Sequence, residues 1–272
     1  MTPQRQDVAL TFVIPVRHQD NARDWTALKR RLTCTLASIA QQDCNDWRAV
    51  VVANHGADLP DLPERIAAVR VDFPPNARHE LGEQSYEEFY DAVRWDKGRR
   101  ILSGMLAAPD TRFYMIVDDD DFVSNRLASF VREHPDANGW KIKHGYVWGQ
   151  GGRLVMKHHN FHFLCGTSLI VNREAYRLPP SLAEADVEWV KNRLGSHVMI
   201  DDILVRQGNP LGVLPFFGAV YRIGHEGSHS RAAGLVREHI FNPERRPREV
   251  LWSLRNLRWL TPAIKREFSC AR

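Results

Sequence analysis

The residues most able to do chemistry are four consecutive aspartates, Asp118–Asp121, which directly follow the apolar run 113–117. We predict that this run is a buried strand, and in open α/β sheets ligands gather beyond the carboxyl ends of strands. Four adjacent carboxylates repel one another, and a hard divalent cation compensates that charge. Mg²⁺ or Mn²⁺ uses one or two carboxylates together with phosphate oxygens of a substrate. The run therefore predicts a Mn²⁺ or Mg²⁺ site that holds a diphosphate; the alternative is a solvated acidic turn.

Alternating apolar and amphipathic stretches must position these acids. The sequence predicts strands over 10–16, 48–53, 69–73, 113–117 and 164–171. Leu28, Leu32, Leu36 and Ile39 recur at the spacing of one helix face, and further helices are expected over 182–194 and 201–207. Strands that alternate with helices are typical of βαβ units. We therefore predict an α/β fold with a mixed, mainly parallel sheet flanked by helices and a C-terminal helical tail.

The order of four segments resembles that in the family 2 glycosyltransferases and their GT-A relatives. Phe12–Val16 opens the predicted sheet, 36–41 is similar to the family's first helix, and Asp96–Arg99 precedes the fourth strand. The aspartate run is similar to the family's DXD-type motif. The resemblance covers residues 8–230 and implies a GT-A fold, the Rossmann-like fold of nucleotide-diphospho-sugar transferases. It also implies metal-dependent transfer of a sugar from a nucleotide-sugar donor to an acceptor hydroxyl.

The resemblance implies roles for individual residues on the donor side. Pro15, Val16 and Arg17 match the family's nucleotide-contacting stretch. Asn54 stands where the family usually has an acid that recognises the base; because an amide can also hydrogen-bond a pyrimidine, a UDP-sugar is favoured. The expected donor-binding residues are Pro15, Val16, Arg17, Asn54, Asp96, Arg99, Asp118 and Asp119.

The same resemblance implies metal ligands and a catalytic base. Asp120 is the expected ligand, with Asp121 as the alternative in register and His225 as a further metal contact. Asp201 and Asp202 are similar to the family's acidic pair at the start of a helix. A carboxylate suits general base catalysis because the acceptor hydroxyl must lose its proton, so we predict Asp202 as the base, supported by Asp201, and single displacement with inversion. The alternative is two acids favourably placed at a helix N-terminus.

The acceptor is expected to be a carbohydrate or a lipid-linked molecule, as in polysaccharide biosynthesis. Gly166 and Thr167 are similar to the family's acceptor-side strand, and Trp148 could stack on a sugar, although core packing is the alternative for an aromatic side chain. Other function classes stay open. Clustered aspartates also serve metal-dependent hydrolases and nucleotidyltransferases, and a non-catalytic nucleotide-sugar binder would keep the fold without turnover.

Charge and composition predict the domain organisation and the partners. We expect a transferase domain over residues 1–230 and a basic helical tail over 231–272. The tail carries ten Lys or Arg and four Glu, a net charge of +6 within a chain of net charge +4. It is expected to contact an anionic membrane surface or a second subunit as a homodimer, and no nucleic-acid partner is expected; the alternative is an exposed helix with solvated charges. Scattered cysteines and a short N-terminal apolar run predict a cytoplasmic protein, at most peripheral to the inner face of the membrane.

Overall fold

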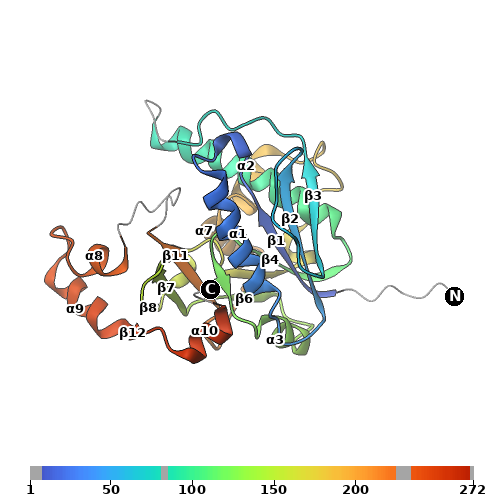
Figure 1. Cartoon of the computed structure of the whole chain (residues 1–272). Coiled ribbons are helices and arrows are strands. Elements are labelled where there is room, and N and C mark those ends of the chain that lie inside the picture. The colour runs from blue at the N-terminus through green and yellow to red at the C-terminus, as the bar shows by residue number, and fades with distance from the viewer. Residues whose placement is uncertain (1–7, 81–84, 225–233, 270–272) are drawn as a thin grey trace.

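The computed structural model describes residues 8–80, 85–224 and 234–269. Its first sheet has seven strands in the order β10-β6-β9-β4-β1-β2-β3 (Figure 1). The strands are β1 (Val8–Pro15), β2 (Trp47–Asn54), β3 (Ile66–Val71), β4 (Thr111–Ile116), β6 (Gly139–Lys141), β9 (Leu169–Asn172) and β10 (Gly212–Val213). β3, β2, β1 and β4 run parallel, whereas β9 is antiparallel to its neighbours β4 and β6. The predicted mixed, mainly parallel sheet is confirmed.

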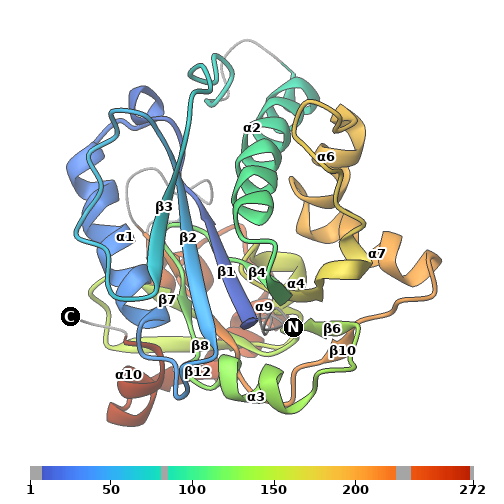
Figure 2. The same cartoon turned by 90° about the vertical axis from the view of Figure 1, so that its right-hand side faces the viewer.

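Helices cover both faces of this sheet (Figure 2). The long helices are α1 (Trp25–Ile39) and α2 (Tyr86–Ala107), with α6 (Val187–Arg193) and α7 (His197–Arg206) beside α2. Alternate residues of β1 point to opposite faces, so Phe12 packs in one hydrophobic cluster with Leu32 of α1, while Val13 packs in another with Ile101 of α2. The Asp24 carboxylate accepts a hydrogen bond from the Ala27 N–H at 2.8 Å and caps α1, as helix-start chemistry requires.

A second sheet has five strands in the order β12-β8-β7-β11-β5. The strands are β5 (Phe122–Val123), β7 (Gly145–Gly149), β8 (Leu154–His158), β11 (Ala219–Ile223) and β12 (Leu257–Trp259). β4 belongs to the first sheet and β5 to the second, so the four aspartates lie in the turn that joins the two sheets. This acidic turn is therefore held at both ends by strand pairing.

The C-terminal segment is only partly helical. It contains α8 (Leu235–His239), α9 (Pro247–Asn256) and α10 (Pro262–Phe268). Between α9 and α10, β12 pairs antiparallel with β8, and Phe268 is buried in the hydrophobic cluster of the second sheet. The Ser124 hydroxyl donates to the Glu267 carboxylate at 2.7 Å, just beyond β5. The segment predicted as a helical tail thus also contributes a strand and core residues to the second sheet.

Two local predictions differ from the structure. The strand expected over 164–171 begins only at Leu169, because α4 (Phe161–Leu164) precedes it; α3 (Leu127–Glu133) and α5 (Arg173–Tyr176) are the remaining short helices. Ser196 caps α7 by accepting a hydrogen bond from the Met199 N–H at 3.4 Å, so that helix begins before the second acidic pair. Among the residues that the structure describes, no helix is both long and apolar enough to cross a membrane.

Candidate functional site

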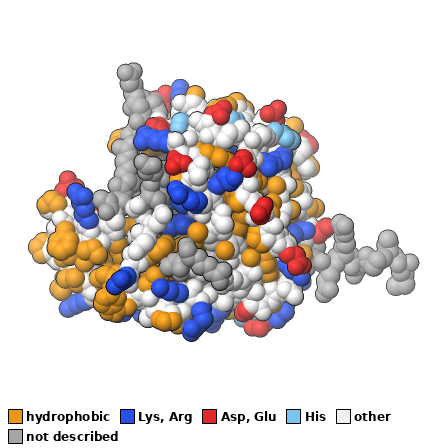
Figure 3. All heavy atoms as spheres, viewed as in Figure 1, with side chains coloured by type: hydrophobic (Ala, Val, Ile, Leu, Met, Phe, Trp, Pro, Cys, Tyr) orange, Lys and Arg blue, Asp and Glu red, His pale blue; other side chains and the backbone are white. Residues whose placement is uncertain are grey.

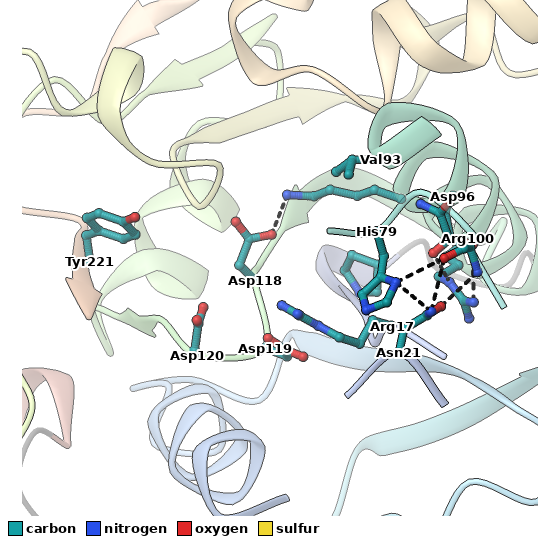
Figure 4. Close-up of a pocket in the computed structure, with 13 residues that line it drawn as sticks. Arg17, Asn21, His79, Val93, Asp96, Arg100, Asp118, Asp119, Asp120 and Tyr221 are labelled. Carbon is teal, nitrogen blue, oxygen red and sulfur yellow. Dashed lines mark hydrogen bonds and ion pairs between the residues drawn. The ribbon is translucent and has the colours of Figure 1, made fainter. Parts of the chain in front are cut away.

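A cavity of about 190 Å³ lies beyond the carboxyl ends of β1 and β4 (Figure 4). This volume far exceeds that needed by one water molecule, so the cavity can admit a small-molecule ligand. Its walls come from segments that are far apart in the sequence. The lining residues are Pro15, Arg17, Asn21, Asn76, His79, Val93, Asp96, Lys97, Arg100, Asp118, Asp119, Asp120 and Tyr221. Six of the predicted site residues therefore meet in one place: Pro15, Arg17, Asp96, Asp118, Asp119 and Asp120.

Asp118 forms an ion pair with Lys97 of α2 in this cavity (Figure 4). Burial lowers the pKa of Lys97, but the charge of Asp118 and the hydrogen bond to it outweigh burial, and the pKa is raised. Gly166 lies against the pair: a β-carbon at this position would be 2.6 Å from Asp118 Oδ2 and 3.0 Å from Lys97 Nζ. Glycine at position 166 thus leaves room for the pair, which fixes the direction of the Asp118 carboxylate.

Asp119 and Asp120 are, with Asp118, the acids of the turn that line the cavity. Burial and then the charge of Asp120 raise the pKa of Asp119 to about 6, although the nearby Arg17 and Arg31 oppose this shift. Arg17 points toward the turn from the end of β1 (Figure 4). The two arginines therefore do not cancel the effect of burial and of Asp120 on Asp119, and a divalent cation bound here would favour the ionised carboxylate.

Asp121 has a structural role and does not line the cavity. Its side chain is fully buried; Oδ2 accepts hydrogen bonds from the Thr167 hydroxyl at 2.6 Å and the Cys165 thiol at 3.0 Å. Oδ1 accepts a hydrogen bond from the Arg222 N–H at 3.2 Å. Because both oxygens are used inside the protein, the structure does not favour Asp121 as the metal ligand. Thr167, expected to contact the acceptor, is fully buried and instead also accepts a hydrogen bond from the Asp118 N–H at 2.9 Å.

A buried polar network forms the wall of the cavity opposite the acidic turn. The Arg100 guanidinium donates to Asp96 Oδ2 at 3.0 Å and to Asn54 Oδ1 at 2.7 Å. Asp96 also accepts a hydrogen bond from Arg99 at 2.6 Å, and the Asn54 amide donates to the Phe73 carbonyl at 2.6 Å. Both ends of the Asn54 amide are thus committed within the protein. Asn54 and Arg99 support this wall without lining the cavity.

The second acidic pair lies outside the cavity, in the middle of α7. Asp201 forms an ion pair with Lys141 at 2.8 Å, and its other carboxylate oxygen is buried without a hydrogen-bond partner. Asp202 is exposed. The prediction that these acids begin a helix is wrong, because the helix begins at His197, directly after the Ser196 cap and four residues before Asp201. α7 nevertheless adjoins the cavity, since His197 of α7 lines a small pocket together with Lys97.

Three remaining predicted residues do not line the cavity or cannot be placed. Val16 is fully buried in the core beside β1, so its side chain contacts hydrophobic neighbours. Trp148 is 4% exposed, and its indole N–H donates to the Gly152 carbonyl at 2.9 Å, so core packing is its observed role. His225 falls outside the described residues.

The residues of the acidic turn fit an open divalent-cation site. Within the described part of the chain, no three His, Cys, Asp or Glu side chains converge as metal ligands. A closed protein cage is therefore not formed by these residues. One or two carboxylates completed by substrate phosphate oxygens are, however, the usual ligand set of Mg²⁺, and Asp119 and Asp120 in the cavity wall meet that requirement.

The sequence alone did not single out several cavity residues. Lys97 and Arg100 lie within and next to the segment Asp96–Arg99, but nothing in the sequence tells which side of a helix faces a ligand. Asn21 accepts a hydrogen bond from the Asn76 N–H at 2.8 Å, and its amide nitrogen lies 2.9 Å from His79 Nδ1. The hydrogen bond between Asn21 and Asn76 joins two segments that are 55 residues apart, and no pattern in the local sequence predicts it.

Comparisons with known proteins give the following results. The sequence matches no protein-family profile and no curated protein. The structure is similar to a crystal structure of S. aureus TarS residues 1–349, with 14% identity and a TM-score of 0.44 over 78% of this chain and 60% of that one. A crystal structure of S. aureus TarS gives 15% identity and a TM-score of 0.42, with 79% and 37% covered. The apo form of mouse xyloside xylosyltransferase 1 gives 12% and 0.39, with 75% and 84% covered. The chain thus spans about 60% of the length of the first of these structures.

Proposed function

We propose that this protein is a glycosyltransferase of the GT-A type, which transfers a sugar from a nucleotide-sugar donor to an acceptor hydroxyl. The observation that carries the proposal is the convergence of Asp118, Asp119 and Asp120 with Arg17 and Lys97 around one cavity at the carboxyl edge of a mainly parallel sheet. Ligands of open α/β sheets bind at this edge. Carboxylates and cationic side chains together suit a ligand that carries both a diphosphate and a bound metal ion.

The cationic side chains would hold the diphosphate of the donor. Arg17 and Lys97 both line the cavity, one from the end of β1 and the other from α2. Because both Asn54 amide atoms are committed to Arg100 and Phe73, base recognition would fall to another polar group that lines the cavity, such as the His79 imidazole. A UDP-sugar is the favoured donor in this proposal, since an imidazole nitrogen can hydrogen-bond the edge of uracil.

Asp120 and Asp119 would hold Mn²⁺ or Mg²⁺. When bound, such an ion would neutralise negative charge on the departing nucleoside diphosphate, usually a large contribution to catalysis. Residues next to these two aspartates would fix the position of the acidic turn. Lys97 holds the Asp118 carboxylate in position, and the Thr167 hydroxyl holds the Asp118 backbone N–H at 2.9 Å.

Asp202 is the proposed general base for the acceptor hydroxyl, in a single displacement with inversion at the anomeric carbon. The side chain of Asp202 is exposed on α7. This helix adjoins the cavity, because His197 of α7 lines a small pocket together with Lys97, which also lines the cavity. Asp201 is instead held by Lys141 and would orient this part of α7. The acceptor would therefore approach from the α7 side of the acidic turn.

A binding experiment and a transfer experiment test the two halves of this proposal. Purified protein is screened by thermal shift against nucleotide-sugars with Mn²⁺, because a ligand of the folded state raises the melting temperature. Asp120→Asn should abolish the metal-dependent shift, whereas Asp202→Asn should keep that shift and lose sugar transfer. Asp20→Asn, a substitution at an exposed aspartate outside the cavity lining, is the matched control. No metal-dependent shift with any nucleotide-sugar would refute the assignment, and donor consumption that needs no acceptor would indicate a hydrolase.

A further inference from the structure

The outer surface of the C-terminal segment carries large apolar side chains that are exposed. We call it the tail patch, and it consists of Phe241 (73% exposed), Leu251 (49%), Trp252 (40%), Leu254 (49%) and Trp259 (69%). Figure 3 shows this apolar surface gathered over α8, α9 and β12, with basic side chains beside it. Contiguous apolar surface of this kind marks an interaction site more often than scattered single residues do.

The orientation of α9 is the reverse of that expected for a helix packed on a globular core. The one buried residue of α9 is Ser253, whose hydroxyl donates to the Glu249 carbonyl at 2.9 Å. Leu251 and Leu254 of the same helix are each about half exposed. A surface helix normally turns its apolar residues inward. Leu251 and Leu254 are therefore available to a partner, while the side of α9 that rests on the protein consists of Ser253 with the half-buried Glu249 and Val250.

The charges around the tail patch are mainly positive. Exposed basic side chains on α9, β12 and their flanks are Arg246, Arg248, Arg255, Arg258, Lys265 and Arg266. The acids of this segment are partly engaged: the Glu238 carboxylate pairs with Arg245 at 3.3 Å, and the Glu249 carboxylate accepts a hydrogen bond from the Arg246 N–H. An apolar, Trp-containing face bordered by Arg and Lys is the combination that lies in the interface of an anionic bilayer.

A second copy of the chain fits this surface less well. Most homodimers are two-fold symmetric and bring one patch against itself. Such a contact would place Arg248 and Arg255 of both copies at the same interface, and like charges brought together in that way oppose association. Anionic lipid headgroups, in contrast, supply the charge that the patch lacks, and Trp252 and Trp259 suit the boundary between headgroups and acyl chains.

We propose that the tail patch docks the protein on an anionic membrane surface, with α9 lying in the plane of the interface. Leu251, Trp252 and Leu254 would enter the outer acyl region, and the flanking arginines would contact lipid phosphates. This inference does not rest on the proposed transferase activity, because it uses residues outside the cavity. Membrane binding can therefore be tested independently of donor binding.

The test is flotation of the full-length chain with vesicles of two compositions. One set contains phosphatidylcholine alone, and the other also contains about 30 mol% phosphatidylglycerol as the anionic lipid. The expected result is binding to the anionic vesicles, weakened by high salt, and little binding to the neutral ones. A triple variant, Leu251→Ser with Trp252→Ser and Leu254→Ser, should lower the partition coefficient at least about tenfold. Arg248→Gln with Arg255→Gln should weaken binding to anionic vesicles only.

A matched control and a fold check keep the outcome decisive. Val187→Ser with Val205→Ser also removes exposed apolar side chains, from α6 and α7, and should leave flotation unchanged. All variants replace exposed residues, and circular dichroism should report an unchanged fold. Equal binding to neutral and anionic vesicles, or equal loss in the control variant, would overturn the proposal. So would a dimer in sedimentation that the triple serine variant dissociates while flotation is absent.

Discussion

Asp119→Asn is expected to stabilise the protein at neutral and alkaline pH in the absence of divalent cations. The pKa of this carboxyl is about 6 in the folded protein against an ordinary value of 3.8, because burial and the charge of Asp120 disfavour its ionised form. Between these two pH values the Asp119 carboxyl therefore takes up a proton when the chain folds. The free-energy penalty for ionising this carboxyl in the folded protein grows as the pH rises from 3.8 to about 6. Above that pH the penalty is complete.

The size of the effect follows from the two pKa values. A difference of about 2.2 pH units corresponds to about 3 kcal/mol at pH 8, since each unit is worth about 1.4 kcal/mol. At pH 4.5 the same linkage gives only about 1 kcal/mol, because Asp119 is then almost fully protonated in the folded state and mostly ionised in the unfolded state. The stabilisation of Asp119→Asn should therefore increase by about 2 kcal/mol between pH 4.5 and pH 8.

Urea unfolding in EDTA at these two pH values measures this difference. Asp20→Asn, at an exposed aspartate, should change the free energy of unfolding by less than about 0.5 kcal/mol at both. Adding Mn²⁺ with UDP should stabilise the wild type more than the variant, because the carboxylate that destabilises the empty cavity is the one proposed to bind the ion. A variant less stable than the wild type at pH 8 would show that Arg17 and Arg31 overcompensate Asp119, and would refute the electrostatic reasoning.

Three further predictions concern the wall of the cavity and the core. Gly166→Ala should weaken UDP binding in the presence of Mn²⁺ at least about tenfold in calorimetry, because its β-carbon displaces the Lys97–Asp118 pair. The same variant should lose less than about 1 kcal/mol of stability, since the displaced atoms are the ends of side chains; a larger loss, or unchanged binding, would contradict this account. Phe268→Ala should cost about 3–5 kcal/mol in urea unfolding because the ring is fully buried, whereas Trp259→Ala, at an exposed ring, should cost little; equal effects would contradict the observed packing. Burial and then the charge of Lys97 lower the pKa of His197, so the contribution of His197 to stability should fall as the pH drops below 6.5. His197→Gln should remove this contribution from the pH dependence; an unchanged slope between pH 7.5 and 5.5 would show that His197 does not contribute.

The sequence predicted three strands of the first sheet well because these strands are buried on both faces and read as continuous apolar runs. β1, β2 and β4 were each expected within two residues of their observed ends. The acidic turn was found for the same reason, since it follows such a run directly. Position along a strand was thus enough to place Asp118 and Arg17 at the same edge of the sheet.

The missed parts of the site depend on contacts between segments distant in the chain. The sequence placed Asp121 among the metal candidates because consecutive aspartates look alike, but only tertiary structure shows that Thr167 and Cys165 engage its carboxylate. The amide of Asn54 was likewise committed by Arg100, which lies 46 positions away. α7 began earlier than expected because the cap at Ser196 outweighed the acidic pair as a helix-start signal.

The way in which the C-terminal segment closes the second sheet has a consequence for how the chain folds during synthesis. β12 pairs with β8, and Phe268 packs in one cluster with Phe122, so this sheet joins the middle of the sequence to its C-terminal segment. Strands β1 to β4 can assemble once the chain up to Ile116 has left the ribosome, whereas Ser124 and Asn125, just after β5, gain their contacts with Glu267 only after α10 has been made. A nascent chain should therefore hold its acidic turn anchored only on the β4 side until β11 emerges and pairs with β5, and the contacts with Glu267 are added later.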